Sequence, residues 1–243
     1  MSSLYAARAG QAGPRVVLLH GAGGCHHVWH YFLKRLGRSG RVYALDLPGH
    51  CQSPPPKEHT FPEFVRLLNQ WFDQELGGPP EVLVGHSMGG LLALALAAQR
   101  PQVRRLVVLS AALRIPVKPR TQVQPEDVEE ICRRIYHQER WVRWCVEHRS
   151  QVILSTPPIM LQDLDMVRQV DLRPLAPHIQ QPVHLAVGRY DEVIPEDLIR
   201  ETLQHLPQAR LTWLENSGHM PHLEEAARVA EIIEEEMSHA ATS

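Results

Sequence analysis

Residues 82–90 have the sequence Val82-Leu83-Val84-Gly85-His86-Ser87-Met88-Gly89-Gly90, and the apolar run Leu91–Ala98 follows directly. The first three residues predict a buried strand, and the run after Gly90 predicts a helix that is apolar on every side and therefore also buried. Between them lies the pattern G-x-S-x-G. In a sharp strand-to-helix turn the serine takes a strained backbone, so the residues two positions to either side must be small. The segment therefore predicts Ser87 as a nucleophile at the start of a helix.

Short apolar runs bounded by turn residues recur on both sides of this segment and predict further strands. They are Val16–Leu19, Val42–Leu45, Leu106–Leu109, His184–Val187 and Leu211–Leu214. Helical patterns lie between and after them, at Val28–Leu36, Phe61–Leu76, Glu196–Leu206 and Glu224–Met237. This alternation predicts an α/β fold with a mostly parallel sheet and helices on both faces.

Residues 113–181 interrupt the alternation. They show no strand pattern, are rich in proline, and contain two helical stretches near Glu126–Tyr136 and Glu139–Arg149. We expect a core formed by residues 1–112 and 182–243, with residues 113–181 inserted in the same domain as a helical cap (lid) over the carboxyl edge of the sheet.

The charge balance and hydropathy exclude some classes of function. The 243 residues include 25 Lys and Arg and 27 Asp and Glu, for a formal net charge of -2. A chain this close to neutral lacks the broad basic field of a nucleic-acid binder. No apolar run approaches the roughly 20 residues that span a bilayer, and the start has no stretch typical of a signal peptide. We therefore expect a cytoplasmic monomer or homodimer without nucleic-acid or membrane partners.

Neither cysteine nor histidine spacing predicts a metal site. Cys25, Cys51, Cys132 and Cys145 form no C-x-x-C pair and are expected to be free thiols. The histidines His26, His27 and His30 are clustered, but no H-E-x-x-H or third-ligand pattern accompanies them. The chain also lacks the glycine-rich phosphate motifs, so no cofactor is expected.

A serine nucleophile needs a base, and the base needs an orienting acid. His219 follows the last predicted strand, and Asp191 follows the strand before it. Carboxyl ends of parallel strands meet at one edge of a sheet, so we expect both side chains near Ser87. Glu192 is the nearest competitor for the acid. Asp163, Asp165 and Asp171 lie in the cap and fit less well.

The loop His20-Gly21-Ala22-Gly23-Gly24 follows the first predicted strand. Its glycines let a backbone N–H approach a substrate oxygen, so we expect the N–H groups of Ala22 and Met88 to form an oxyanion hole. The residues expected to contact substrate are Gly21, Trp29, His86, Leu113, Trp141, Trp144, Met160 and Leu161. For the three tryptophans, packing between helices is an equally good explanation.

Taken together, these motifs resemble those of the α/β-hydrolase superfamily from about Val16 to Met237. The matching pieces are His20-Gly21-Ala22-Gly23-Gly24, Asp46-Leu47-Pro48-Gly49-His50, Gly85-His86-Ser87-Met88-Gly89-Gly90, Gly188-x-x-Asp191 and Gly218-His219. The chain looks most like the small carboxylesterases with a short helical cap. The resemblance implies an eight-stranded, mostly parallel sheet whose second strand is antiparallel, with a short remnant of the first strands before Val16.

One residue departs from the superfamily pattern. Cys51 stands where relatives usually have glycine, and a side chain at positive φ costs of order 1–2 kcal/mol. A thiol near the mouth of a pocket is also a candidate reactive group.

The function predicted from these residues is hydrolysis of carboxylic esters with small to medium acyl groups, through an acyl-enzyme intermediate. The same three residues also serve C–C bond hydrolysis, thioester hydrolysis, lactone opening and cofactor-free perhydrolysis. A haloalkane dehalogenase is disfavoured, because that resemblance calls for Asp in place of Ser87. A non-catalytic small-molecule-binding protein on the same fold is the alternative from another class, and the complete set of catalytic residues argues against it.

Overall fold

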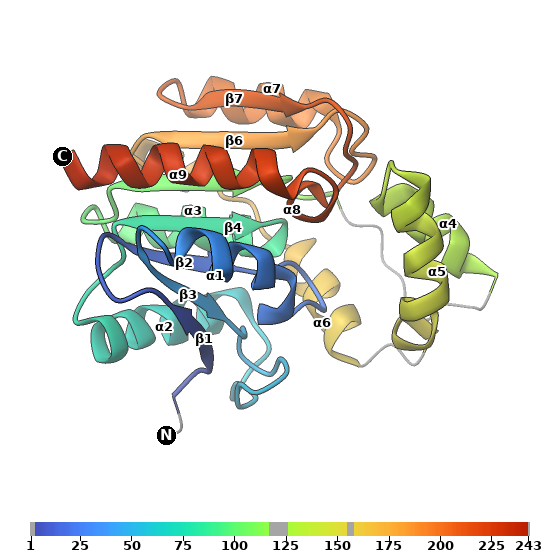
Figure 1. The fold of residues 1–243 in the computed structure, drawn as a ribbon, viewed down its shortest axis with the longest axis horizontal. Coiled ribbons are helices and arrows are strands. Elements are labelled where there is room, and N and C mark those ends of the chain that lie inside the picture. Colours follow the sequence, from blue (N-terminus) through green and yellow to red (C-terminus); the bar gives the residue numbers. More distant parts are fainter. Residues whose placement is uncertain (1–2, 117–125, 155–157, 243) are drawn as a thin grey trace.

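A computed structural model describes residues 3–116, 126–154 and 158–242. Its centre is a seven-stranded sheet in the order β1-β3-β2-β4-β5-β6-β7 (Figure 1). The strands are β1 (Ala6–Ala9), β2 (Arg15–Leu19), β3 (Arg41–Leu45), β4 (Val82–His86), β5 (Arg105–Leu109), β6 (Val183–Gly188) and β7 (Arg210–Leu214). β1 pairs with β3 in antiparallel orientation, and every other neighbouring pair is parallel.

The α/β architecture predicted from the sequence is confirmed, and each strand predicted from an apolar run is present. The expected count of eight strands was wrong for the described residues, where the sheet has seven. The antiparallel strand is β1, the first in the chain, and it forms one edge of the sheet.

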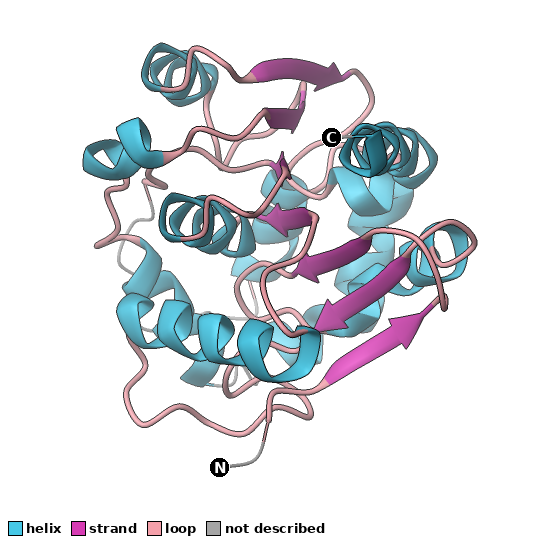
Figure 2. Ribbon diagram, turned by 90° about the vertical axis from the view of Figure 1, so that its left-hand side faces the viewer, coloured by secondary structure: helices cyan, strands magenta, loops and turns pink. Residues whose placement is uncertain are grey.

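Helices cover both faces of the sheet (Figure 2). One face carries α2 (Phe61–Trp71), which continues into the π-helical turn η2 (Phe72–Leu76), together with α3 (Met88–Gln99) and α7 (Glu196–His205). The other face carries the 3-10 turn η1 (His26–Trp29), α1 (His30–Leu36) and α9 (Ala226–Thr242), which follows the short α8 (Pro221–Glu224). The two buried clusters under these helices form the core.

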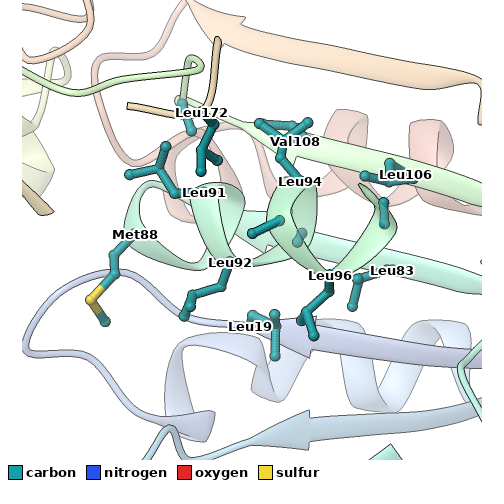
Figure 3. Close-up of a cluster of buried hydrophobic side chains, with 14 of the residues drawn as sticks. Leu19, Leu83, Met88, Leu91, Leu92, Leu94, Leu96, Leu106, Val108 and Leu172 are labelled. Carbon is teal, nitrogen blue, oxygen red and sulfur yellow. The ribbon is translucent and has the colours of Figure 1, made fainter. Parts of the chain in front are cut away.

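Helix α3 is buried along almost its whole length, as its apolar sequence predicts. Every residue from Met88 to Ala97 is buried. Leu91, Leu92, Leu94 and Leu96 lie among side chains of the neighbouring strands and the cap, which include Leu19, Leu83, Leu106, Val108 and Leu172 (Figure 3). This packing fixes the N-terminal end of α3, directly after Ser87.

The cap contains α4 (Asp127–Ile135), α5 (Glu139–Leu154), α6 (Pro158–Val167) and the 3-10 turn η3 (Arg173–His178). Helices α4 and α5 share a small apolar cluster of Val128, Cys132, Tyr136, Val142 and Cys145. Cys132 and Cys145 form a disulfide, with Cα atoms 6.0 Å apart. The expectation of free thiols was therefore wrong for these two residues, because the α4–α5 hairpin brings them together. Cys25 and Cys51 are free thiols.

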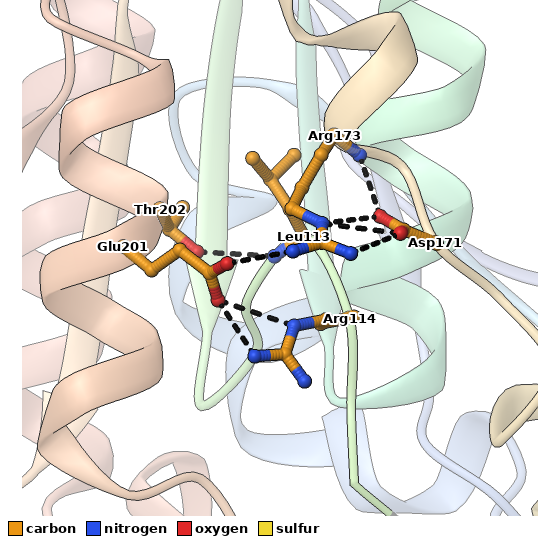
Figure 4. A network of polar contacts seen from close by, with 6 residues as sticks. All are labelled: Leu113, Arg114, Asp171, Arg173, Glu201 and Thr202. Atoms are coloured by element: carbon orange, nitrogen blue, oxygen red, sulfur yellow. Dashed lines mark hydrogen bonds and ion pairs between the residues drawn. The ribbon is translucent and has the colours of Figure 1, made fainter.

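The two chain connections between core and cap meet at α7 (Figure 4). The N–H of Leu113 donates to Thr202 Oγ1 at 3.1 Å, and the N–H of Leu172 donates to the carbonyl of Leu113 at 2.8 Å. Glu201 pairs with Arg114 at 3.0 Å and with Arg173 at 2.9 Å. The cap thus leaves and re-enters the core at one anchored point.

Across the part of the chain that the structure describes, no helix combines the length and the apolar character needed to cross a membrane.

Candidate active site

Ser87 lies in the turn between β4 and α3, with φ 52° and ψ −116°. A non-glycine residue rarely adopts positive φ, and the surrounding contacts hold it there. The N–H of Ser87 donates to the carbonyl of Leu109 at 2.9 Å, and the Ser87 carbonyl accepts from the N–H of Gly90 at 2.8 Å. A Cβ on Gly85 would lie 2.1 Å from the Gly89 carbonyl oxygen, and one on Gly89 would lie 2.3 Å from the carbonyl oxygen of Leu19. Both positions therefore require glycine.

The structure brings the three residues proposed from the sequence into hydrogen-bond contact. His219 Nε2 lies 3.0 Å from Ser87 Oγ, and His219 Nδ1 lies 3.0 Å from Asp191 Oδ2. Asp191 Oδ1 also accepts from the N–H groups of Val193 and Ile194, both at 2.9 Å. These backbone donors fix the carboxylate, and it is Asp191, rather than Glu192, that meets the imidazole. Ser87 is only partly buried, so its hydroxyl can be reached.

A second histidine, His86, forms a hydrogen bond with the backbone of His219. His86 is buried, and its Nε2 lies 2.7 Å from the carbonyl oxygen of His219. Burial, together with the neighbouring histidines, holds the pKa of His86 well below its usual range, so the neutral ring donates from Nε2 to this carbonyl. The ring of His86 contacts that of His222 in a tilted arrangement, and the His222 ring contacts Trp29 in the same way. The structure thus places His86 and the fully buried Trp29, both predicted to contact substrate, in the packing beneath the site.

The glycine-rich loop passes directly beside Ser87. A Cβ on Gly21 would lie 3.3 Å from Ser87 Cβ. His20 holds this loop, because its Nδ1 donates to the Gly21 carbonyl at 2.8 Å while its Nε2 accepts from the N–H of Leu47 at 3.0 Å. Burial lowers the pKa of His20 to about 4, which keeps the ring in the neutral form that this pair of contacts needs. Ala22 follows Gly21, and Met88 begins α3.

Asp163 of α6 connects the cap to the same loop. Its buried carboxylate accepts from the N–H of Gly23 at 2.8 Å and contacts His50 Nε2 and His59 Nε2, each at 2.8 Å. Although burial opposes it, the hydrogen bonds from the two histidines lower the pKa of Asp163. The pKa of His50 is raised by this carboxylate despite the burial of the ring. Sequence reasoning considered Asp163 only as a competing acid and missed this role.

Glu224 connects the cap to the loop that carries His219. One carboxylate oxygen accepts from the N–H groups of His137 and Gln138, at 2.8 and 2.7 Å, and the other accepts from the N–H of Gly218 at 2.7 Å. Burial raises the pKa of this carboxyl even against its three backbone donors. Sequence reasoning did not identify Glu224, and no local signal marks it.

The remaining residues predicted to contact substrate lie in different surroundings. Met160 of α6 packs against the glycine-rich loop, since a Cβ on Gly23 would lie 2.8 Å from Met160 Cγ. Leu113 is buried at the base of the cap. Trp141 stacks on Tyr136 inside the α4–α5 hairpin, and Trp144 stacks on the exposed His148. Leu161 is partly buried on α6. Of this group, Met160 lies against the glycine-rich loop.

Cys51 adopts φ 45°, the strained conformation anticipated from its departure from glycine. Desolvation and the nearby Asp46 carboxylate raise the pKa of this exposed thiol. The free thiol is therefore not activated as a thiolate nucleophile.

Comparison with known proteins places this chain in the alpha/beta hydrolase family. The chain matches the model of the alpha/beta hydrolase family over residues 16–232. A pimeloyl-[acyl-carrier protein] methyl ester esterase from Methylococcus capsulatus is 29% identical, with 92% of this chain and 94% of that protein aligned. Among solved structures, the enol-lactonase from Burkholderia xenovorans LB400 has a TM-score of 0.84 at 23% identity, covering 97% of this chain and 96% of that one. A thermophilic esterase from Thermogutta terrifontis has a TM-score of 0.80 at 24% identity, covering 98% and 94%.

Proposed function

Because this chain belongs to the alpha/beta hydrolase family, we propose that it hydrolyses carboxylic esters through an acyl-enzyme formed on Ser87. The observation that carries the proposal is the continuous contact from Ser87 Oγ through His219 to Asp191. The sequence relatives, which include esterases, support ester hydrolysis as the class of reaction.

In the proposed mechanism Ser87 Oγ attacks the ester carbonyl carbon, and its proton moves to His219 Nε2. Asp191 holds the Nδ1–H of the imidazole and stabilises the imidazolium. The tetrahedral intermediate collapses, and His219 protonates the departing alcohol. Water then attacks the acyl-enzyme while His219 takes a proton from it, and release of the acid restores Ser87.

The proposed oxyanion hole consists of the N–H groups of Ala22 and Met88. The close approach of Gly21 to Ser87 brings the glycine-rich loop to the nucleophile, and the N-terminus of α3 adds the positive end of a helix dipole. Loss of one such donor typically costs about 3–4 kcal/mol in transition-state stabilisation. The contacts of His20 and Asp163 with this loop would keep the donors in place.

We propose esters of small to medium acyl chains as substrates, with Met160 of α6 beside the acyl group because it packs on Gly23. The name of the relative from Methylococcus capsulatus adds methyl esters of dicarboxylic acyl chains to the panel worth testing.

The test is hydrolysis of p-nitrophenyl esters from acetate to decanoate, together with a methyl dicarboxylate, a thioester and a lactone. Wild type, Ser87→Ala and the exposed Ser39→Ala are compared. We expect turnover of the esters by wild type and Ser39→Ala and a loss of at least about 10⁴-fold in Ser87→Ala. Retained ester turnover in Ser87→Ala, or wild-type activity confined to the lactone or thioester, would contradict the proposal.

A further inference from the structure

Soft and borderline metal ligands gather at a second place, outside the Ser87 site. Among the described residues, Cys25 Sγ, a ring nitrogen of His27 and Cys51 Sγ all lie within 4.8 Å of one another. Cys25 follows the glycine-rich loop, whereas Cys51 comes from the loop after β3. Cys25 is partly buried, and His27 and Cys51 are exposed, so an ion can enter from solvent.

The spacing of these atoms fits a tetrahedral transition-metal ion. Bonds of about 2.3 Å to sulfur and about 2.0–2.1 Å to nitrogen place tetrahedral ligand atoms roughly 3.5–3.8 Å apart. The three ligand atoms lie within 4.8 Å of one another and therefore need to close by at most about 1.3 Å, which side-chain rotation supplies. Two thiolates and an imidazole favour Zn²⁺ over Mg²⁺ or Ca²⁺, which prefer oxygen ligands.

One buried carboxylate holds the two ligand-bearing loops in place. Asp46 Oδ1 accepts from the N–H of His26 at 2.8 Å, and Asp46 Oδ2 accepts from the N–H of Gln52 at 3.1 Å. His26 follows Cys25, and Gln52 follows Cys51, so both cysteines stand next to a fixed peptide group. The carboxylate is fully buried. The backbone beside each cysteine is thus held in place, and only the side chains need to rotate to bind an ion.

The backbone of Cys51 supplies an independent observation. Its φ of 45° is strained for any residue with a side chain, whereas glycine adopts this conformation freely. A cysteine at this position costs folding free energy, and its thiol is not used by the proposed ester hydrolysis. The free energy of binding an ion to this thiol would offset the cost in folding free energy.

We propose that Cys25, His27 and Cys51 form a binding site for one Zn²⁺ ion, distinct from the Ser87 site. Binding releases the two thiol protons to solvent, and the two thiolates and the neutral imidazole take three positions of the tetrahedron. The fourth position is taken by water or by His26. The His26 ring lies near Cys51, and its Nδ1 contacts Asp46 at 2.8 Å. The ion cross-links the end of the glycine-rich loop to the loop after β3.

Cobalt is the probe, because tetrahedral Co²⁺ with thiolate ligands gives visible d–d bands and a near-ultraviolet charge-transfer band. Metal-free, reduced protein is titrated with Co²⁺ and then with Zn²⁺. We expect one equivalent of Co²⁺ to produce both bands, Zn²⁺ to bleach them, and bound Zn²⁺ to raise the Tm. In the fully reduced protein, octahedral Co²⁺ without a thiolate charge-transfer band overturns the proposal.

Cys51→Gly is the decisive variant, because it removes a ligand and also relieves the strained φ. It should fold, show a higher Tm than metal-free wild type, and bind Co²⁺ at least tenfold more weakly. His27→Gln should also lose at least tenfold, whereas His30→Gln, a nearby exposed histidine outside the cluster, should bind as wild type does. Cys132→Ser/Cys145→Ser should keep the cobalt spectrum. Unchanged binding by Cys51→Gly, or loss of the spectrum in Cys132→Ser/Cys145→Ser, overturns the assignment.

Discussion

The backbone N–H of His219 donates a hydrogen bond to the carbonyl oxygen of Ile135, 2.8 Å away. Ile135 is the last residue of cap helix α4, so the cap bonds directly to the histidine that contacts Ser87. Glu224 makes the same connection from the other side through Gly218, His137 and Gln138. The cap is therefore part of the framework that positions His219.

Removal of the Glu224 carboxylate should weaken both folding and catalysis. In Glu224→Ala three backbone N–H groups lose their acceptor, of which that of Gly218 makes a buried hydrogen bond, so we expect a loss of about 2–4 kcal/mol in the free energy of unfolding. Because His219 is then less well positioned, kcat should fall while KM changes little. Urea unfolding and ester kinetics measure the two effects. The exposed Glu231→Ala is the matched control, and a Glu224→Ala enzyme with wild-type kcat would show that this contact is structural only.

The Cys132–Cys145 disulfide should stabilise the α4–α5 hairpin. It joins residues separated by 13 positions, and closing a loop of that size contributes about 3 kcal/mol. We expect Cys132→Ala/Cys145→Ala to lower the resistance of the cap to limited proteolysis much more than that of the core. Mapping the cleavage sites checks this. Cleavage that begins in the core strands would contradict it.

Acid should destabilise the fold through its buried neutral histidines. Burial lowers the pKa of His20 to about 4 and that of His222 to about 3, and it lowers that of His86 as well. These rings are neutral in the folded chain, whereas the unfolded chain protonates them below an ordinary pKa of about 6.5. Their contribution to stability is complete above that pH and is lost as the pH falls toward the folded values. Each contributes a slope of about 1.4 kcal/mol per pH unit in that interval.

His222→Leu isolates one of these contributions, because neither ring nitrogen of His222 has a hydrogen-bond partner among the described residues. Urea unfolding at pH 7.5, 6 and 5 should show a smaller loss of stability on acidification than in wild type. The exposed His205→Gln should keep the wild-type slope. A His222→Leu slope equal to that of wild type would mean that this ring does not titrate as inferred.

The contact between Asp163 and His50 should give the cap the opposite pH dependence. The pKa of His50 is raised in the folded chain, so its stabilising contribution is complete below about pH 6.5 and is lost as the pH rises through the folded value. The lowered pKa of Asp163 keeps the carboxylate charged throughout this range. Proteolysis of the α6 region should therefore speed up as the pH rises above about 6.5 in wild type. His50→Gln should abolish this pH dependence, and an equally steep profile in that variant would contradict the assignment.

The sequence was sufficient to predict those features that depend on residues close together in the chain. A Cβ on Gly85 would clash with Gly89 inside the same turn, so the G-x-S-x-G pattern marks that position directly, whereas a Cβ on Gly89 would clash with Leu19 of the neighbouring strand β2. The strands are recognisable in the sequence as short apolar runs. Asp191 and His219 were found because each follows a strand, and strand ends share an edge. Their catalytic role, the oxyanion hole and the substrate contacts stay predictions.

Contacts between cap and core could not be predicted. Asp163 reaches Gly23 across 140 positions, and Glu224 reaches His137 across 87. Such pairs depend on how the cap folds back, which no periodicity in the sequence specifies. The Cys132–Cys145 pair depends on the α4–α5 hairpin in the same way. Tryptophan is a common residue in the walls of pockets, and this suggested a substrate contact for Trp29. In the structure, Trp29 instead packs inside a buried hydrophobic cluster.

The most direct test of the central claim is to trap the acyl-enzyme. Wild type is mixed with a p-nitrophenyl ester, quenched in acid within the first turnover, and digested for mass spectrometry. The account predicts an acyl adduct on the peptide that contains Ser87, with a stoichiometric burst of p-nitrophenol, and neither in Ser87→Ala. Steady turnover by wild type with no adduct, or with the adduct on another residue, would contradict it.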